Sequence, residues 1–84
     1  MFYAYVLESM SNPGTRYIGH TSNLKRRLEE HNAGENPSTA QRRPWRVRLY
    51  IAVESRELAQ HFERYLKSGS GHAFANRHFW ARPP

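Results

Sequence analysis

The sequence predicts a small α+β domain in which a three-stranded antiparallel β-sheet is flanked by helices. Three observations support this fold class. Two short segments rich in aromatic and aliphatic residues are separated by a turn at residues 11–14, which is typical of a hairpin. Residues 45–53 alternate strictly between apolar and other side chains, and two stretches show helical apolar spacing. No internal repeat is visible in the 84 residues, so we expect one domain over residues 1–84.

The hairpin occupies the start of the chain. Residues 2–7 suit a strand. Residues 11–14 (Ser-Asn-Pro-Gly) indicate a turn, since proline fixes φ and glycine tolerates positive φ. Residues 15–19 return as the second strand and end in a tight turn at Gly19. One face of the first strand carries Tyr3, Tyr5 and Leu7.

The pairing of these strands decides whether two tyrosines meet. Cross-strand partners in an antiparallel pair share a constant sum of residue numbers. If Glu8 lies opposite Gly14, that sum places Tyr5 opposite Tyr17. We therefore expect the two phenol rings to be direct cross-strand neighbours.

The first helix is expected directly after the hairpin. Thr21 or Ser22 can cap it, because a side-chain hydroxyl accepts a hydrogen bond from an unpaired backbone N–H of the first turn. Residues 32–34 (Asn-Ala-Gly) end it, with the glycine that helix C-termini favour.

Two residue pairs on this helix have the one-turn spacing that places side chains on one face. Leu24 and Leu28 form an apolar pair that faces the core. Arg27 and His31 repeat the spacing at the flank of that pair, toward the edge of the buried face. The neighbouring Arg26 points further toward solvent, so Arg27 is the candidate for a functional role.

The middle of the chain contains a loop and then the clearest strand. Residues 35–44 are polar and contain two prolines, which predicts a loop with room for one short helical turn. Residues 45–53 predict a third strand with one buried face. That face carries Trp45, Val47, Leu49, Ile51 and Val53.

The second main helix follows this strand. Ser55 caps it, and residues 68–71 (Ser-Gly-Ser-Gly) end it. Glu63 borders its apolar stripe. Residues 72–80 predict a last short helix, closed by Pro83 and Pro84. The apolar stripe consists of Leu58, Ala59, Phe62 and Leu66.

The composition favours a polyanionic partner such as nucleic acid. The net charge is +6, and 2 of the 13 basic residues are lysines, which leaves 13 − 2 = 11 arginines able to bind phosphate in bidentate fashion. The alternative is a solvated basic surface without a ligand. The absence of cysteine excludes disulfides and thiolate zinc sites. No apolar run approaches the roughly 20 residues needed to span a bilayer, so we expect a soluble, cytoplasmic protein without membrane contact.

Each candidate site residue also has a purely structural interpretation. Tyr5 and Tyr17 can be ordinary strand aromatics. His31 can be a helix C-terminal residue that the macrodipole stabilises. Glu63 can form a surface ion pair with Lys67 one turn later, worth only about 0.2–0.5 kcal/mol. Taken singly, none of these residues indicates catalysis.

In combination, the motifs resemble the GIY-YIG nuclease superfamily. Tyr3-Ala4-Tyr5 is similar to the first signature element, with Tyr3 and Ala4 in place of its glycine and isoleucine, and Tyr17-Ile18-Gly19 matches the second. Residues 42–45 (Arg-Arg-Pro-Trp) and 63–69 are similar to the small stand-alone bacterial members. The resemblance covers nearly the whole chain.

This resemblance implies a metal-dependent endonuclease that hydrolyses phosphodiester bonds in DNA, including single-stranded or structured DNA, in repair or nucleic-acid processing. It implies that Tyr5 or Tyr17 accepts a proton from the attacking water and that Arg27 neutralises charge on the phosphate oxygens. His31 would position a tyrosine or relay a proton. Glu63 would hold one Mg²⁺ or Mn²⁺ ion.

The hairpin register and the helical phase of Arg27 and His31 predict that the binding surface is a concave and basic face. The alternative function is a nucleic-acid-binding or partner-interaction module that keeps the fold but cuts poorly. For a further polar residue that some of these nucleases place after the first helix, the candidates are Ser38, Thr39 and Gln41. Contacts with DNA are expected from Arg26, Arg42, Arg43 and Lys67. The residues expected to cluster on this face are Tyr5, Tyr17, Arg27, His31 and Glu63.

Overall fold

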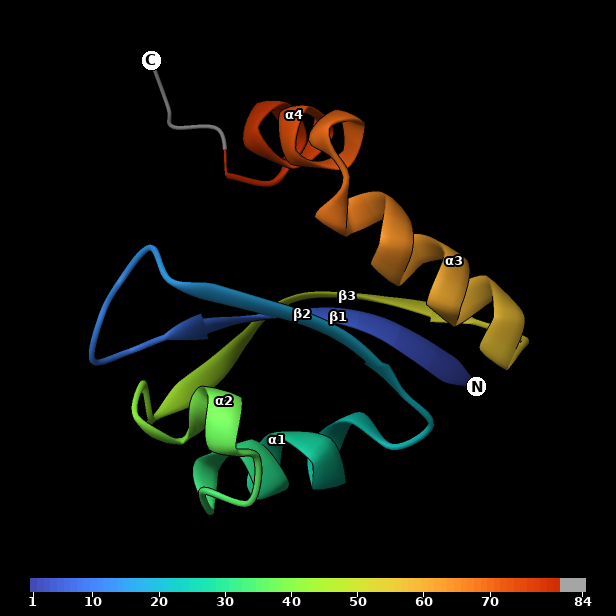
Figure 1. Ribbon diagram of the computed structural model, residues 1–84. Coiled ribbons are helices and arrows are strands. Elements are labelled where there is room, and N and C mark those ends of the chain that lie inside the picture. Colours follow the sequence, from blue (N-terminus) through green and yellow to red (C-terminus); the bar gives the residue numbers. More distant parts are fainter. Residues whose placement is uncertain (81–84) are drawn as a thin grey trace.

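The computed structural model describes residues 1–80, which form a three-stranded sheet between two layers of helices (Figure 1). This arrangement confirms the α+β class. The predicted stop at Pro83 and Pro84 lies outside the described residues. Along the chain the elements are β1 (Phe2–Ser9), β2 (Arg16–Thr21), α1 (Leu24–Asn32), α2 (Pro37–Ala40), β3 (Trp45–Val53), α3 (Arg56–Lys67) and α4 (Gly69–His78).

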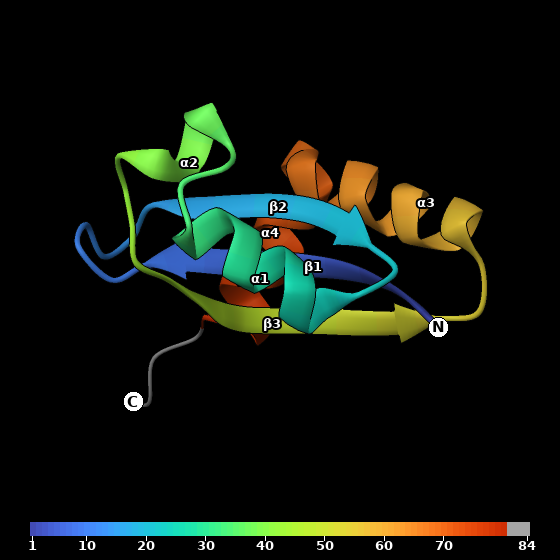
Figure 2. The same ribbon diagram turned by 90° about the horizontal axis from the view of Figure 1, so that it is seen from below.

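The sheet has the strand order β2-β1-β3, and both strand pairs are antiparallel. Helices α1 and α2 lie on one face, which we call the α1 face, and α3 and α4 lie on the other, the α3 face (Figures 1 and 2). Because β1 is central and both faces are covered, every residue from Ala4 to Ser9 is buried. Strand β2 forms an edge of the sheet, so one side of it is open to other groups.

The hairpin register differs from the predicted one by two residues. Tyr5 pairs with Gly19 instead of Tyr17, because the turn is longer and closes with a backbone hydrogen bond from Ser9 to Thr15 at 2.9 Å. A shift by two residues keeps each side chain on its face. Both tyrosines therefore lie on the α1 face, as diagonal neighbours with ring centroids 6.4 Å apart.

A β-bulge changes the pattern of β3. The register shifts between Val6 and Leu7, whose partners are Leu49 and Val47, and Arg48 is the extra residue between them. An extra residue reverses the alternation of side chains beyond it. The prediction of a single buried face is therefore wrong. Trp45 and Val47 share the α1 face, whereas the α3 face receives Leu49, Ile51 and Val53.

The first helix begins slightly later than predicted. Its cap is Asn23, not Thr21 or Ser22, and the Asn23 side chain accepts a hydrogen bond from a first-turn N–H at 3.0 Å. Thr21 instead accepts from the backbone N–H of Asn23 at 3.1 Å. The predicted end is confirmed, since α1 stops at Asn32 and Gly34 follows with φ of 80°.

Helix α3 begins as predicted. The Ser55 hydroxyl accepts from the backbone N–H of Leu58 at 3.1 Å. The apolar stripe is buried at Ala59 and Leu66, but Leu58 is 39% exposed and does not belong to the core. The stripe is therefore narrower than predicted.

The last helix begins earlier than residue 72. Its cap is Ser68, whose hydroxyl accepts from the backbone N–H of Gly71 at 3.1 Å, so α4 starts at Gly69. The short helical turn predicted within residues 35–44 is α2. Over residues 1–80, every helix is too short or too polar to cross a membrane.

Candidate functional site

The side chain of Tyr5 lies across Gly19 on the neighbouring strand. A Cβ atom at residue 19 would stand 2.6 Å from the Tyr5 Oη atom and 2.8 Å from its Cζ atom, which is closer than real Cβ contacts. The predicted turn at Gly19 is wrong, because the residue lies inside β2 and its φ is not positive. Glycine is required there because the buried phenol occupies the space of a side chain.

His31 is 1% exposed and is held through both ring nitrogens. Its Nε2 atom lies 3.1 Å from Tyr5 Oη, and its Nδ1 atom lies 2.8 Å from Thr39 Oγ1. The Tyr17 ring packs against the imidazole with centroids 4.9 Å apart. Burial and the positive charge of Arg27 lower the pKa of His31. The imidazole is therefore neutral at pH 7.

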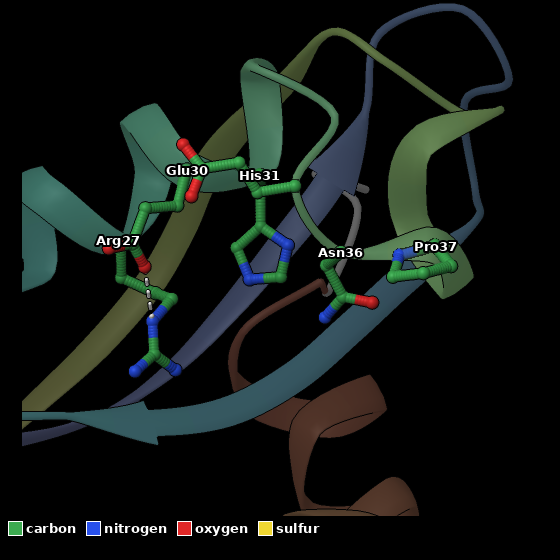
Figure 3. Close-up of a pocket in the computed structure, with 6 residues that line it drawn as sticks. Arg27, Glu30, His31, Asn36 and Pro37 are labelled. Atoms are coloured by element: carbon green, nitrogen blue, oxygen red, sulfur yellow. Dashed lines mark hydrogen bonds and ion pairs between the residues drawn. The ribbon is translucent and has the colours of Figure 1, made fainter.

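Arg27 lines an open cavity of about 380 Å³ beside α1 (Figure 3). Its Nε donates to Glu30 Oε1 at 3.1 Å, and its Nη1 donates to the backbone oxygen of His20 at 3.3 Å. Figure 3 shows the His31 ring between Arg27 and Asn36. The guanidinium is thereby fixed at the wall of this open cavity. The lining residues are Arg27, Glu30, His31, Glu35, Asn36 and Pro37.

The two tyrosines differ in their surroundings. Tyr5 is 1% exposed, and burial raises the pKa of its hydroxyl, an effect that the nearby Arg27 guanidinium only partly offsets. Tyr17 is half-buried and lines a second cavity of about 310 Å³ together with Thr39 and Arg42. Tyr5 and His31 therefore form a buried polar cluster. Tyr17 packs on the outside of this cluster, next to the second cavity.

Glu63 does not share the face of the other four candidates. It belongs to α3, and its Oε1 lies 2.5 Å from Nδ1 of His20 while its Oε2 accepts from Lys67 Nζ at 2.6 Å. Side chains alternate along β2, so His20 faces α3 while Tyr17 faces α1. The prediction of one shared concave face is therefore wrong for Glu63. The ion pair considered as its structural alternative is present.

His20, on the edge strand β2, contacts candidate residues from both faces of the sheet: Arg27 on the α1 face and Glu63 on the α3 face. Its backbone oxygen accepts from Arg27, and its imidazole contacts Glu63. The charge of Glu63 is close enough to contribute to the raised pKa of Tyr5. His20 is not among the residues that the sequence motifs point to. Its alternation with Tyr17 places it on the α3 face, but nothing in the sequence shows which α3 residue meets it.

One residue of the loop after α1 also joins the cluster. Thr39 is 1% exposed and contacts His31, whereas the other candidates, Ser38 and Gln41, are exposed. The backbone oxygen of Thr39 also accepts from the indole N–H of Trp45 at 2.9 Å. Thr39 is therefore held on both its backbone and its side chain.

Among the candidate site residues, Glu63 has the only carboxylate that could hold a metal ion. Burial acts to raise the pKa of Glu63, but hydrogen bonds from Lys67 and His20 outweigh it and hold the pKa below its usual range. Within residues 1–80, no group of three or more His, Cys, Asp or Glu could hold a metal together. An ion at Glu63 would take its other ligands from water and substrate oxygens, as Mg²⁺ commonly does. Lys67, 54% exposed, is the partner that such an ion can replace.

The basic residues predicted to bind DNA lie at different positions around the site. Arg26 is exposed and pairs with Glu30 at 3.3 Å. Arg42 lines the cavity of Tyr17, and Arg43 donates to a backbone oxygen of α2 at 2.7 Å. Lys67 lies on the α3 side, beside the carboxylate described above. Their exposed contacts are weak, so they can be exchanged for phosphate contacts.

Comparisons with known proteins agree with this architecture. A family model described as the GIY-YIG catalytic domain matches residues 1–76. The structure-specific endonuclease subunit SLX1 of Candida dubliniensis is 36% identical over 81 residues, which cover 88% of this chain but 27% of that protein. The chain thus spans far less than the full length of SLX1. A UPF0213 protein of Streptococcus pyogenes serotype M3 is 39% identical over 66 residues, which cover 77% of this chain and 70% of that protein.

A solved structure shows a similar fold. The solution NMR structure of a UPF0213 protein from Bacillus halodurans matches with a TM-score of 0.53 and 28% identity, and the match covers 94% of this chain and 87% of the other. Together these comparisons confirm the predicted resemblance and the predicted three-stranded α+β fold.

Proposed function

The chain belongs to the GIY-YIG family, and from this premise we propose that it is a metal-dependent endonuclease that hydrolyses phosphodiester bonds in DNA. The main support for this proposal is that His20 contacts both Arg27 and Glu63. Its backbone oxygen holds Arg27 and its imidazole holds Glu63, so a guanidinium and a carboxylate from opposite faces reach one residue of β2. A phosphate at this edge can meet a cation on one side and a metal ligand on the other.

Arg27 is the phosphate-binding residue of this proposal. A guanidinium is permanently charged and can donate two parallel N–H groups to a phosphate. Its contacts with Glu30 and His20 fix its orientation at the cavity wall before substrate binds. In the transition state, Arg27 neutralises the charge that develops on the non-bridging oxygens.

Tyr5 is the general base, because its hydroxyl contacts His31 and is close enough to Arg27 for the guanidinium to act on its pKa. Burial raises the pKa of this hydroxyl, which disfavours a standing phenolate. The hydroxyl therefore takes a proton from the attacking water while it passes its own proton to the neutral imidazole of His31. Tyr17 packs on that imidazole and keeps the ring in place.

Glu63 supplies the protein ligand for one Mg²⁺ or Mn²⁺ ion, which would act as a Lewis acid on the departing 3′ oxygen. Its lowered pKa keeps the carboxylate ionised, as a hard cation requires. His20 fixes one carboxylate oxygen, and the exposed Lys67 leaves the other one accessible to exchange.

A substrate panel tests this function. Supercoiled plasmid, single-stranded DNA and branched DNA are incubated with the protein, with and without Mg²⁺ or Mn²⁺. The branched substrate is included because the relative SLX1 is a structure-specific endonuclease subunit. We expect cleavage of at least one substrate and its loss when the ion is chelated. Tight DNA binding without cleavage of any substrate would instead favour the alternative, a nucleic-acid-binding module.

Two variants assign that cleavage to this site. Tyr5→Phe and Arg27→Ala should each reduce it by about 100-fold or more, since each removes a group that acts on the reacting atoms. The matched control is Tyr65→Phe, which removes a hydroxyl from an exposed tyrosine of α3. Equal activity of the Tyr5 and Tyr65 variants would exclude Tyr5 as the base.

A further inference from the structure

Thr39 is placed to decide which nitrogen of His31 carries the proton. We propose that Thr39 is a positioning residue whose hydroxyl, anchored on the backbone oxygen of Asn36, fixes the Nδ1–H tautomer of His31. Nε2 is then free to accept the proton of Tyr5. The catalytic consequence rests on the proposed function, but the tautomer itself can be measured without any activity.

Hydrogen bonds connect Tyr5 on the sheet, through His31, to Thr39 after α1. Tyr5 Oη lies 3.1 Å from His31 Nε2, and His31 Nδ1 lies 2.8 Å from Thr39 Oγ1. The Thr39 hydroxyl lies 3.3 Å from the backbone oxygen of Asn36, to which it can donate. The three connected side chains are each 1% exposed. Before substrate and the attacking water bind, these groups must therefore satisfy one another rather than rely on solvent.

A neutral imidazole has one donor and one acceptor, so the hydrogen bonds can run in only two directions. In the first, Tyr5 donates to Nε2, Nδ1–H donates to Thr39, and Thr39 donates to Asn36. Every hydrogen in this series then has an acceptor. The series ends at the carbonyl oxygen of Asn36, which only accepts. In the second, Thr39 donates to Nδ1 and Nε2–H donates to Tyr5.

The second direction leaves the hydrogen of the Tyr5 hydroxyl without an acceptor, since His31 is the hydrogen-bond partner of Tyr5 Oη within residues 1–80. An unpaired buried hydroxyl is costly, so the first direction is favoured. Arg27 favours it as well. The guanidinium is close enough to act on the pKa of Tyr5 but can only donate, so it cannot accept the Tyr5 hydrogen, which is left for Nε2.

Ser38 provides a matched control on the same loop. Its hydroxyl is exposed and donates to the side-chain oxygen of Asn36 at 2.6 Å, without contact to His31. Removing it changes the same loop by one hydroxyl and leaves the imidazole partners in place. Ser38→Ala therefore controls for general effects of losing a hydroxyl near α2.

Two-bond ¹H–¹⁵N NMR of the full chain at neutral pH measures the tautomer directly. We expect Nδ1–H for His31 in the wild type, in Ser38→Ala and in Thr39→Ser. In Thr39→Val we expect Nε2–H to become populated beside Nδ1–H, because a methyl group cannot accept from Nδ1–H and either tautomer then leaves one hydrogen of the His31–Tyr5 pair unpaired. Nε2–H in the wild type, or Nδ1–H as the sole form in Thr39→Val, would overturn the proposal. The wild-type measurement decides even if the valine variant does not fold.

The cleavage assay then tests the consequence for catalysis. Thr39→Val should lower kcat in proportion to its Nε2–H population, with little change in KM, because the base lacks a proton acceptor in that form while the phosphate site stays intact. Thr39→Ser should recover most of the loss. Undiminished kcat in a valine variant that populates Nε2–H would remove the positioning role. If no substrate is cleaved by the wild type, the proposed function fails, while the NMR result still decides the tautomer.

Discussion

Tyr5 and Gly19 show how one side chain can dictate the residue type opposite it. Gly19→Ala would place a methyl group 2.6 Å from Tyr5 Oη, so the buried phenol would have to move away from His31. We expect the free energy of unfolding, measured with denaturant, to fall by about 1–3 kcal/mol. The control Gly69→Ala meets nothing within 4 Å and should be neutral or stabilising by up to about 1 kcal/mol. Equal stability of the two variants would contradict the steric explanation.

His31 should make the stability of the protein depend on pH. Burial and the charge of Arg27 lower its pKa below the ordinary 6.5 in the folded state. Below about pH 6.5 the unfolded chain binds a proton at this residue that the folded protein does not, so the free energy of unfolding decreases as the pH falls. At higher pH both states hold a neutral imidazole, and this contribution is constant.

Denaturant unfolding from about pH 8 to pH 5 measures this effect. His31→Gln should flatten the decline, because the titrating group is gone. His61→Gln removes an exposed histidine of α3 and should retain the slope of the wild type. Identical slopes for the wild type and His31→Gln would show that another group governs the decline.

The residues of the α1 half of the site could be predicted because they depend on local periodicity. The one-turn spacing places Arg27 and His31 together, and strand alternation places Tyr5 and Tyr17 on one face. The contact of Thr39 with His31 could not be predicted, because it requires α2 to fold back against α1. No sequence pattern encodes that return.

At the scale of the elements, α1 and β3 are joined by two hydrogen bonds of one side chain. Asn32 Nδ2 donates to the backbone oxygen of Trp45 at 3.0 Å, and Asn32 Oδ1 accepts from its N–H at 2.6 Å. Asn32→Ala should lower the free energy of unfolding by about 1–3 kcal/mol, since both backbone groups lose this partner. The control Asn76→Ala, on the exposed surface of α4, should change it by less than about 0.5 kcal/mol. A loss no larger than that of the control would mean that water replaces the amide.

The bounds of the elements could be predicted better than their pairing. Alternation marks the full extent of β3, and Ser55 marks the start of α3. The hairpin register could not be fixed, because it depends on a turn whose length the residues 11–14 leave open. The bulge at Arg48 is also invisible in the sequence. Helices cover both faces of the sheet, so an apolar side chain is buried on either one.

At the scale of the whole molecule, the positive charge predicts DNA binding that weakens with salt. The logarithm of affinity should fall with the logarithm of salt concentration by about 0.9 for each phosphate neutralised. Removing Arg42 and Arg43 together, by Arg42→Ala with Arg43→Ala, should reduce that slope by about 1.8. All sequences should be affected about equally, since phosphate contacts carry no base information.

Fluorescence anisotropy titrations at several salt concentrations measure these slopes. The charge-matched control, Arg64→Ala with Arg77→Ala, removes two exposed arginines from α3 and α4 on the other face. Its slope should stay close to that of the wild type. Equal slopes for the two double variants would mean that net charge, rather than the surface next to Tyr17, determines binding.

The sheet itself explains why the complete site could not be predicted. Arg27 and Glu63 come from helices on opposite faces, and only the edge strand β2 brings them to one residue, His20. A sequence pattern assigns residues to faces, but it does not show that groups on two faces can meet at an edge. The position of Glu63 relative to Arg27 therefore depends on the packing of α3 against β2.

The central claim is that Glu63 is the metal ligand of a DNA-cleaving site, and plasmid nicking by Glu63→Gln tests it most directly. Glutamine keeps the shape of the side chain but removes the charge that holds Mg²⁺. The control Glu57→Gln makes the same change at an exposed position of α3. We predict that nicking collapses in Glu63→Gln alone, while its DNA affinity persists or rises because a negative charge near the phosphate is gone. Undiminished metal-dependent nicking by Glu63→Gln would contradict the account.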